Sequence, residues 1–302
     1  MTDVTRPVLR WHGGKWNLAP WVIQHFPQHQ LYVEPFGGAA SVLLRKPEAY
    51  SEVYNDLDQE AVNLFEVLRD PGSAARLCDL IFLTPFARDE FNAAYEPSED
   101  PVERARRLVI RSHMGFGSDG ACGSYRTGFR ANSNRSGTTP AHDWANLPEA
   151  LVAVAARLRG VTVENRPAIQ VMRSHDGPET LHYCDPPYLP ETRSRSGRVA
   201  GVGSAAVYRH EMSAEDHEQL LDALKALQGM VVLSGYPSAL YDDALTGWRR
   251  VEREALADGA RKRTEVLWLN PACMTALDAR AGGAGSPLFS HNEAAGCGEV
   301  MA

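Results

Sequence analysis

The first 69 residues alternate between short apolar runs and amphipathic segments. Runs at 31–34 and 52–55 have the length and apolar character of buried strands, and the first leads into a tight turn at 35–38. Residues 39–45 and 58–69 are predicted to form helices, and in the second the apolar side chains recur on one face. Those side chains are Ala61, Leu64, Phe65 and Leu68. This strand–helix–strand order predicts parallel strands with right-handed crossovers.

The same alternation resumes after residue 145. Helices are predicted at 147–158 and 213–227, and the second begins with Ser-Ala-Glu-Asp, which resembles a capping box. Further strands are predicted at 161–164, 180–184, 230–234, 248–253 and 264–269. The last two are separated by Asp-Gly-Ala, a hairpin signal. The fold class is therefore α/β, with a discontinuous domain formed by residues 1–69 and 146–270.

The segment between these two parts, residues 70–145, has a different pattern. Helical periodicity at 73–82, 87–95 and 102–113 is followed by a stretch rich in Gly, Ser, Asn and Arg. A loop of this length inside a compact protein is usually functional or disordered. We therefore predict a helical insertion that carries a functional loop. Residues 271–302 are rich in Ala and Gly and are predicted to form a mobile tail.

Length and composition exclude several classes of protein. A chain of 302 residues that is 44% hydrophobic can bury a large core without disulfides. The five cysteines form no Cys-x-x-Cys pair, which indicates a reducing compartment and argues against a zinc site, so we expect no metal. The start of the chain has no apolar core like that of a signal peptide, and no stretch approaches the ~18 apolar residues of a membrane span. A cytoplasmic protein without a membrane partner is expected.

Positive charge is concentrated in two segments of an acidic chain. The net charge is −7, yet residues 104–135 contain seven arginines and one acid, and residues 192–209 contain four arginines and no acid. Such clusters are typical of nucleic-acid binding. They are equally typical of solvated helix faces and loops, so charge alone leaves both interpretations open.

A glycine turn and an aspartate form the first candidate site. The turn consists of Glu34, Pro35, Phe36, Gly37 and Gly38. Glycines at the carboxyl end of a parallel strand let the backbone approach a ligand, and Asp56, nineteen residues past Gly37, is placed to bind ribose hydroxyls. An ordinary tight turn and a helix-capping role, which Asp58 could also fill, are the alternatives. The turn does not match Gly-x-Gly-x-x-Gly, so the pair favours an adenosine-containing ligand over a dinucleotide.

The sequence Asp185-Pro186-Pro187-Tyr188 follows the predicted strand at 180–184. Consecutive prolines fix the backbone and remove N–H donors, which leaves a rigid cluster of acceptors. Such acceptors could bind both hydrogens of an amino group on a base, while Tyr188 offers a flat ring on which an extruded base can stack. The alternative is a rigid turn that merely ends a strand.

Taken together, these motifs resemble the Dam-like family of DNA adenine N6-methyltransferases. The resemblance runs from about residue 10 to 270 and rests on the order of Trp11-His12-Gly13-Gly14-Lys15, the glycine turn, Asn55-Asp56 and Asp185–Tyr188. It implies a Rossmann-like, mostly parallel seven-stranded methyltransferase sheet with one antiparallel strand near its edge. It also makes residues 70–145 a target-recognition insertion. Residues 115–135 resemble phage-type members more than bacterial housekeeping ones.

The resemblance implies S-adenosylmethionine as cofactor and double-stranded DNA with a flipped adenine as partner. The expected catalytic residues are Asp185, Pro186, Pro187 and Tyr188. The expected cofactor-binding residues are Trp11, Lys15, Glu34, Pro35, Phe36, Gly37, Gly38, Asp56 and Asp185. The expected DNA contacts are Arg126, Arg130, Arg135, Arg193, Arg195 and Arg198. The recognised DNA sequence, the oligomeric state and the choice between restriction–modification, phage and housekeeping roles stay open.

Other functions compete with this one. An RNA or protein-amide methyltransferase would use similar motifs, often with Asn at the position of Asp185. A non-catalytic nucleic-acid-binding module would need only the arginine segments. Cytosine-C5 methylation requires a nucleophilic cysteine, usually after a proline, and the chain has no Pro-Cys pair. An NAD-dependent oxidoreductase is the remaining alternative for a Rossmann-like sheet.

Overall fold

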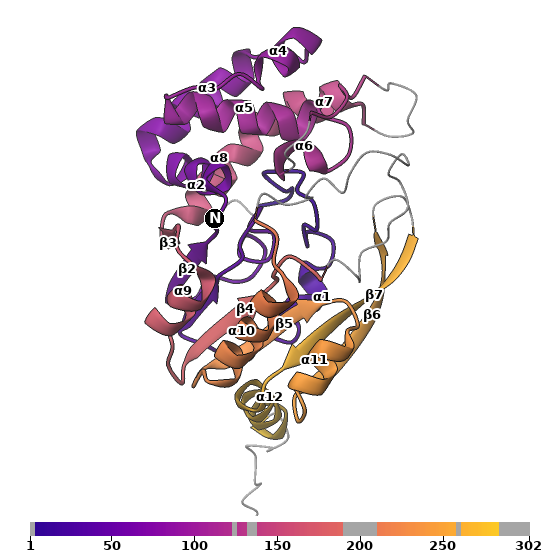
Figure 1. Cartoon of the computed structure of the whole chain (residues 1–302). Helices are drawn as coiled ribbons and strands as arrows, with labels where there is room; N and C mark the ends of the chain where they lie inside the picture. Colours follow the sequence, from indigo (N-terminus) through magenta and orange to yellow (C-terminus); the bar gives the residue numbers. More distant parts are fainter. Residues whose placement is uncertain (1–3, 123–125, 132–137, 190–209, 258–260, 284–302) are drawn as a thin grey trace, which may run out of the picture.

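The chain forms a twisted α/β sheet with a helical layer at one end (Figure 1). The computed structural model describes residues 4–122, 126–131, 138–189, 210–257 and 261–283. The described strands form one seven-stranded sheet in the order β3-β2-β1-β4-β5-β7-β6. Their bounds are β1 Leu31–Glu34, β2 Ser51–Asn55, β3 Val161–Glu164, β4 Thr180–Cys184, β5 Met230–Gly235, β6 Arg249–Ala257 and β7 Arg261–Leu269.

Strands β1 to β5 pair with one another in parallel, whereas β7 is antiparallel to both β5 and β6. The predicted fold class, including the antiparallel strand near one edge, is confirmed. The predicted hairpin pairs β6 with β7, and its turn at 258–260 lies outside the described residues.

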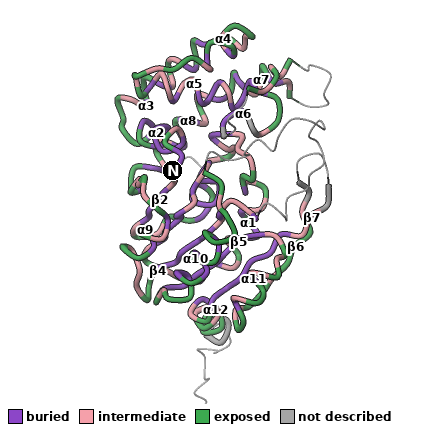
Figure 2. Tube along the Cα trace, viewed as in Figure 1, coloured by how far each residue is buried: buried purple, intermediate pink, exposed green. Residues whose placement is uncertain are grey.

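The sheet buries side chains on both faces, as a strand alternates its side chains between them. Within β5, Val231 and Leu233 belong to one apolar cluster, while Val232 belongs to another. The first cluster includes residues of α9 (Ala168–Ser174), α10 (Ala214–Lys225) and α11 (Ala239–Ala244). The second includes residues of α1 (Ala19–Ile23) and α12 (Pro271–Gly283). Figure 2 shows the burial concentrated in the strands and on the inner sides of these helices.

The helical layer lies at the end of the sheet that carries β3 and β2. Its helices are α2 Gln59–Arg69, α3 Pro71–Leu83, α4 Arg88–Ala93, α5 Pro101–Met114, α6 Asp119–Cys122, α7 Pro140–Ala145 and α8 Leu147–Leu158. Leu108 of α5, Leu151 of α8 and Tyr54 of β2 belong to one apolar cluster, so the layer shares its core with the sheet. The division into a discontinuous catalytic domain and an insertion at 70–145 stays a prediction.

Local capping explains where several helices begin. The side chains of Asp70, Asp100 and Thr139 accept backbone N–H groups at the starts of α3, α5 and α7. Each of these helices also has proline in its first turn, where the missing N–H costs nothing. The predicted capping box is confirmed, because Ser213 and Asp216 exchange hydrogen bonds at the start of α10.

Two local predictions were wrong. Residues 39–45 form turns instead of a helix, because Ala40 has a φ of 52° and the N–H of Leu43 donates to the Glu34 carboxylate. Residues 271–283 were expected in a mobile tail but form α12. Asn270 caps that helix by accepting the N–H of Cys273, whose side chain is buried against the core.

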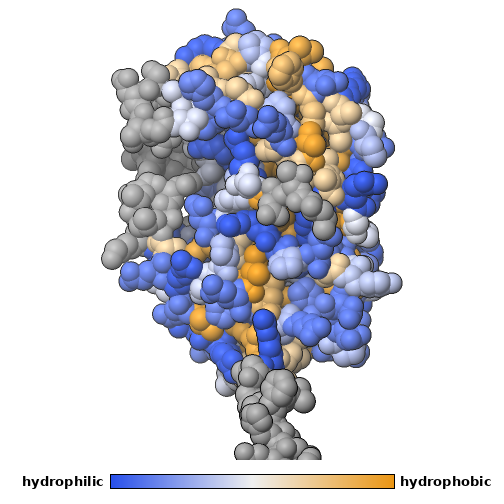
Figure 3. Space-filling model, turned by 180° about the vertical axis from the view of Figure 1, so that it is seen from behind, coloured by the Kyte–Doolittle hydropathy of each residue, from blue (hydrophilic) through white to orange (hydrophobic). Residues whose placement is uncertain are grey.

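Two observations concern the membrane and the surface of the protein. No helix in the described part of the chain is long and apolar enough to cross a membrane. On the face turned away from the view of Figure 1, hydrophobic atoms form separate patches among hydrophilic ones (Figure 3).

Candidate active site

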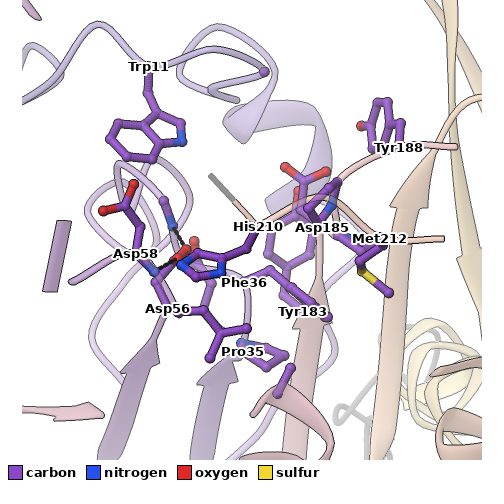
Figure 4. A pocket seen from close by; sticks show the side chains of 18 of the residues that line it. Trp11, Pro35, Phe36, Asp56, Asp58, Tyr183, Asp185, Tyr188, His210 and Met212 are labelled. Carbon is purple, nitrogen blue, oxygen red and sulfur yellow. Dashed lines mark hydrogen bonds between the residues drawn. The ribbon is translucent and has the colours of Figure 1, made fainter. Parts of the chain in front are cut away.

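A pocket of about 520 Å³ lies at the carboxyl ends of β1, β2 and β4. The carboxyl ends of parallel strands meet at one edge of a sheet, where open α/β folds bind their ligands. The structure therefore brings the glycine turn, Asp56 and Asp185–Tyr188 together around one cavity (Figure 4). The loop containing Trp11 and Lys15 lines the same cavity.

Both glycines of the turn occupy places where a side chain would collide. A Cβ at Gly37 would lie 2.1 Å from Cε2 of the buried Tyr54 ring. Gly38 has a φ of 49°, and a Cβ there would lie 2.8 Å from Nε1 of Trp11. The backbone of this turn therefore packs directly against two aromatic rings and forms a wall of the pocket.

Asp56 closes the next side of the pocket. Its Oδ2 accepts the N–H of Gly38 and its Oδ1 accepts the N–H of Asp58, both at 2.8 Å. Burial raises the pKa of Asp56, although both hydrogen bonds oppose that shift. The helix-capping role belongs to Asp58, which accepts the N–H of Glu60 at the start of α2. Asp56 is thus held rigidly at the pocket and is not the cap of that helix.

Glu34 lies at the same cavity, but its hydrogen bonds are internal. Its Oε2 accepts the Tyr32 hydroxyl at 2.6 Å and the N–H of Leu43 at 3.0 Å. Burial raises the pKa of Glu34 to about 8. These contacts hold the turns at 39–46 against the sheet, so they support a positioning role for Glu34 more than contact with a cofactor.

The loop at 11–15 brings a buried cation to the Asp-Pro-Pro-Tyr motif. Lys15 Nζ lies 2.9 Å from Asp185 Oδ2, donates to the carbonyl of Gly13 and lies 4.7 Å from the centre of the Tyr188 ring. Lys15 therefore holds one oxygen of the proposed catalytic acid, and Trp11 packs over the glycine turn.

The second carboxylate oxygen of Asp185, Oδ1, has no hydrogen-bond partner among the described residues. This oxygen is buried. A buried acceptor without a partner is costly in a folded protein and is found most often at functional sites. Pro186 and Pro187 line the cavity beside it and cannot donate an N–H to it. The edge of the pocket therefore contains a buried acceptor that has no partner among the described residues.

Tyr188 is anchored by groups from two other strands. Its hydroxyl donates to Glu265 Oε2 at 3.1 Å and lies 3.4 Å from the hydroxyl of Ser234. The ring of Tyr236 meets the Tyr188 ring edge-on, with centres 4.4 Å apart. Sequence reasoning treated Tyr188 as a flat ring alone, whereas the structure gives its hydroxyl two neighbours.

Several pocket residues were missed from the sequence. Glu265 stands in β7 between the polar residues 261–264 and the apolar run 266–269, so its sequence position gave no sign that it is buried. His210 and Met212 also line the cavity, with His210 beside Asp56, in a stretch without a recognisable motif (Figure 4).

The chain matches the model of the D12 class N6 adenine-specific DNA methyltransferases over residues 11–228, more than half of its length. The chain belongs to this family. Among curated proteins, it is 28% identical over 283 residues to the DNA adenine methylase of Haemophilus influenzae, covering 86% of this chain and 91% of the relative. It is 25% identical to that of Escherichia coli over 231 residues, covering 72% and 77%, and 26% identical to that of Vibrio cholerae over 205 residues, covering 66% and 71%.

As a D12 class enzyme, the chain is an N6-adenine DNA methyltransferase. The alternatives of an oxidoreductase, a cytosine-C5 enzyme and a non-catalytic binding module are set aside. The strand order of the sheet, with β7 antiparallel beside β5, agrees with the fold that the resemblance implied.

The expected DNA contacts of this D12 class methyltransferase have unequal support. Arg126 is exposed; it donates to Asn92 and lies over the ring of Tyr95. Arg130 is only 12% exposed, and its guanidinium lies 3.8 Å from the Asp143 carboxylate. The remaining candidates lie outside the described residues; they are Arg135, Arg193, Arg195 and Arg198.

Proposed function

We propose that the protein transfers a methyl group from S-adenosylmethionine to the N6 amino group of an adenine flipped out of double-stranded DNA. The observation that carries this proposal is Asp185 Oδ1, a buried acceptor without a partner among the described residues, at the edge of a ligand-sized pocket. It is the arrangement that an amino group with two hydrogens to donate requires.

The pocket fits the cofactor that the family implies. Its volume of about 520 Å³ lies within the ~300–1,000 Å³ range of small-molecule sites. Asp56 would hold the ribose hydroxyls, Phe36 would pack against the adenine ring, and the backbone at Gly37 and Gly38 would allow close approach. S-adenosylmethionine supplies an electrophilic methyl group on a sulfonium centre when it is bound.

The chain's own residues act on the target base. Asp185 Oδ1 and the carbonyl of Pro186 would accept the two hydrogens of the amino group, while Tyr188 stacks on the ring. These contacts orient the nitrogen lone pair toward the methyl carbon. With the cofactor bound, the new N–C bond would form as its C–S bond breaks and the electron pair of that bond returns to sulfur. The nitrogen then loses one proton to water through the Asp185 carboxylate.

Lys15 keeps Asp185 ready for this role. Burial by itself lowers the pKa of Lys15, but the charges of Asp185 and Glu265 outweigh it and raise the pKa above its usual value. Lys15 therefore stays a cation and holds Oδ2, so that Oδ1 points toward the target. Positioning and preorganised charge of this kind supply much of the rate of many enzymes.

The arginines are proposed to hold the DNA. Arg126 has the strongest structural support, because it is exposed in the described segment 126–131. Arg130 would first have to leave Asp143. The other four candidates are supported by the sequence alone. The likeness of residues 115–135 to phage-type members favours a phage origin over a bacterial housekeeping role. A restriction–modification role predicts that the methylated sequence is the one cut by a partner endonuclease.

The test is direct. The purified protein, unmethylated duplex DNA and methyl-labelled S-adenosylmethionine should yield labelled N6-methyladenine, and single-molecule sequencing of the product should reveal one recurring sequence. Calorimetry should show that the cofactor binds in the absence of DNA. Labelled RNA or labelled protein in place of labelled DNA would support the alternative substrates and overturn the proposal.

A further inference from the structure

Glu265 belongs to β7, yet it lies at the active edge of the sheet. The parallel strands β4 and β5 end at this edge, and β7 runs in the opposite direction. The last residue of β5, Gly235, pairs with Val266, so Glu265 stands one position beyond the end of β5. The antiparallel strand thus delivers a carboxylate from a distant part of the sequence to the Asp-Pro-Pro-Tyr motif.

The carboxylate of Glu265 is buried and has a specific partner. Glu265 is 7% exposed, and its Oε2 accepts a hydrogen bond from the Tyr188 hydroxyl at 3.1 Å. A buried tyrosine hydroxyl needs an acceptor, and an ionised carboxylate gives a stronger hydrogen bond than a neutral one. Ser234 offers the same hydroxyl only a longer contact at 3.4 Å. Glu265 is therefore the main anchor of the far end of the Tyr188 ring.

Charge in this cluster also depends on Glu265. Burial and the nearby Asp185 raise the pKa of Glu265, whereas Lys15, Arg263 and the Tyr188 hydroxyl oppose that shift. Lys15 is the buried cation that both carboxylates share, and it also lies over the Tyr188 ring. The ring is thus held at its hydroxyl by Glu265 and on its face by Lys15.

We propose that Glu265 is a positioning residue for methyl transfer, which acts through the Tyr188 hydroxyl to fix the ring on which the flipped adenine stacks. The inference rests on the proposed function of Tyr188. Glu265 touches neither the base nor the cofactor in this scheme. Its main effect on the reaction is to set the angle and depth of the Tyr188 ring.

The decisive experiment is a double-mutant cycle on Glu265→Gln and Tyr188→Phe, which keep the shapes of both side chains. Each single variant should lower the single-turnover methylation rate about tenfold, the scale expected when a base is slightly misplaced. S-adenosylmethionine affinity should stay within twofold of wild type. The double variant should be no slower than either single variant, because both changes break one contact.

A matched control is Glu252→Gln, which removes an exposed carboxylate from the neighbouring strand β6 and should leave the rate unchanged. Rates are normalised to the fraction of protein that binds cofactor, so a partly unfolded variant still gives a result. A duplex with 2-aminopurine at the target position reports separately whether the base is extruded, and extrusion should persist in Glu265→Gln.

The outcomes are distinct. A Glu265→Gln rate equal to wild type, or rate losses that multiply in the double variant, would overturn the positioning role. A wild-type protein that methylates no DNA adenine would overturn the proposed function instead, before any variant is compared.

Discussion

The pocket and the helical layer both contain many charged side chains, but they use them differently. At the sheet edge, the buried Lys15 and Glu265 lie beside the half-buried Asp185, and one oxygen of Asp185 has no partner among the described residues. In the helical layer, the four arginines of α5 each pair with a glutamate; they are Arg104, Arg106, Arg107 and Arg111. The clustered arginines of α5 are thus neutralised by ion pairs within the fold. In the pocket, by contrast, one oxygen of Asp185 has no partner among the described residues.

This contrast corrects the simplest interpretation of the arginine-rich segment at 104–135. Its α5 portion acts as part of the folded layer, through pairs with Glu60, Glu90 and Glu103. Among the described residues of this segment, Arg126 in the later portion is the exposed candidate for DNA. A local excess of basic residues is therefore evidence for a nucleic-acid surface only after its internal ion pairs are accounted for.

The largest expected effect comes from substituting Asp185, whose Oδ1 is the acceptor without a partner among the described residues. Asp185→Ala should lower the methylation rate by roughly 10²–10³-fold or more, as expected when a preorganised polar group is removed from a reaction centre. Asp185→Asn keeps the shape but loses the charge, and should also be badly impaired. Single-turnover assays beside thermal melting measure both effects. A well-folded Asp185→Ala protein with a near wild-type rate would show that the pocket charge is structural.

The next effect concerns the cofactor side of the pocket. Asp56→Ala should weaken S-adenosylmethionine binding by about 1–3 kcal/mol, because ribose hydroxyls would lose their buried acceptor. Calorimetry with the purified variant measures the change. Asp58→Ala is the matched control, since it removes a neighbouring carboxylate that caps α2. Equal losses in both variants would mean that helix α2, and not the ribose contact, sets the affinity.

A smaller effect separates the two kinds of arginine. Arg126→Ala should weaken DNA binding severalfold and lower the salt dependence by about 0.9 log unit per log unit of salt for one lost phosphate contact. Arg106→Ala should leave that slope unchanged and lower the melting temperature, because it breaks pairs with Glu90 and Glu103. Filter binding over a range of salt concentrations measures the slopes. A slope that falls in Arg106→Ala alone would reverse the assignment.

The smallest effect is on stability and comes from Glu34. Its pKa of about 8 in the folded protein lies above that of an exposed glutamate, so the folded state binds the proton more tightly. Its contribution is present at low pH and is lost as the pH rises from about 4.5 through 8. Glu34→Gln should flatten this part of the profile of melting temperature against pH by a few degrees. An unchanged profile would place the ionisation of Glu34 outside that window.

Features that depend on a few neighbouring residues could be predicted from the sequence, whereas features that depend on tertiary contacts could not. The strands of the sheet and the turn at 35–38 were predicted because local periodicity, glycine and proline act over a few residues. The helix expected at 39–45 failed because Glu34 takes the N–H of Leu43, a choice set by burial under the sheet. Periodicity alone carries no information about such a competing acceptor.

The partners in the pocket were harder to predict for the same reason. Asp185 was identified from its motif, but its pairing with Lys15 depends on two segments 170 residues apart meeting at one edge. Glu265 reaches Tyr188 only because β7 reverses direction. These contacts depend on strand order and register, which hydrophobic patterns constrain only weakly.

Asn270 has a consequence for how the protein can be divided or fused. Its side chain accepts the N–H groups of Val231 and Cys273 and donates to the carbonyl of Gly229. One amide thereby joins the start of the central strand β5 to the start of α12. A truncation before residue 270 would leave the N–H of Val231 and the carbonyl of Gly229 without these partners, at the start of the strand that carries Ser234. Junctions for chimaeras and tags therefore belong beyond Gly283, where α12 ends.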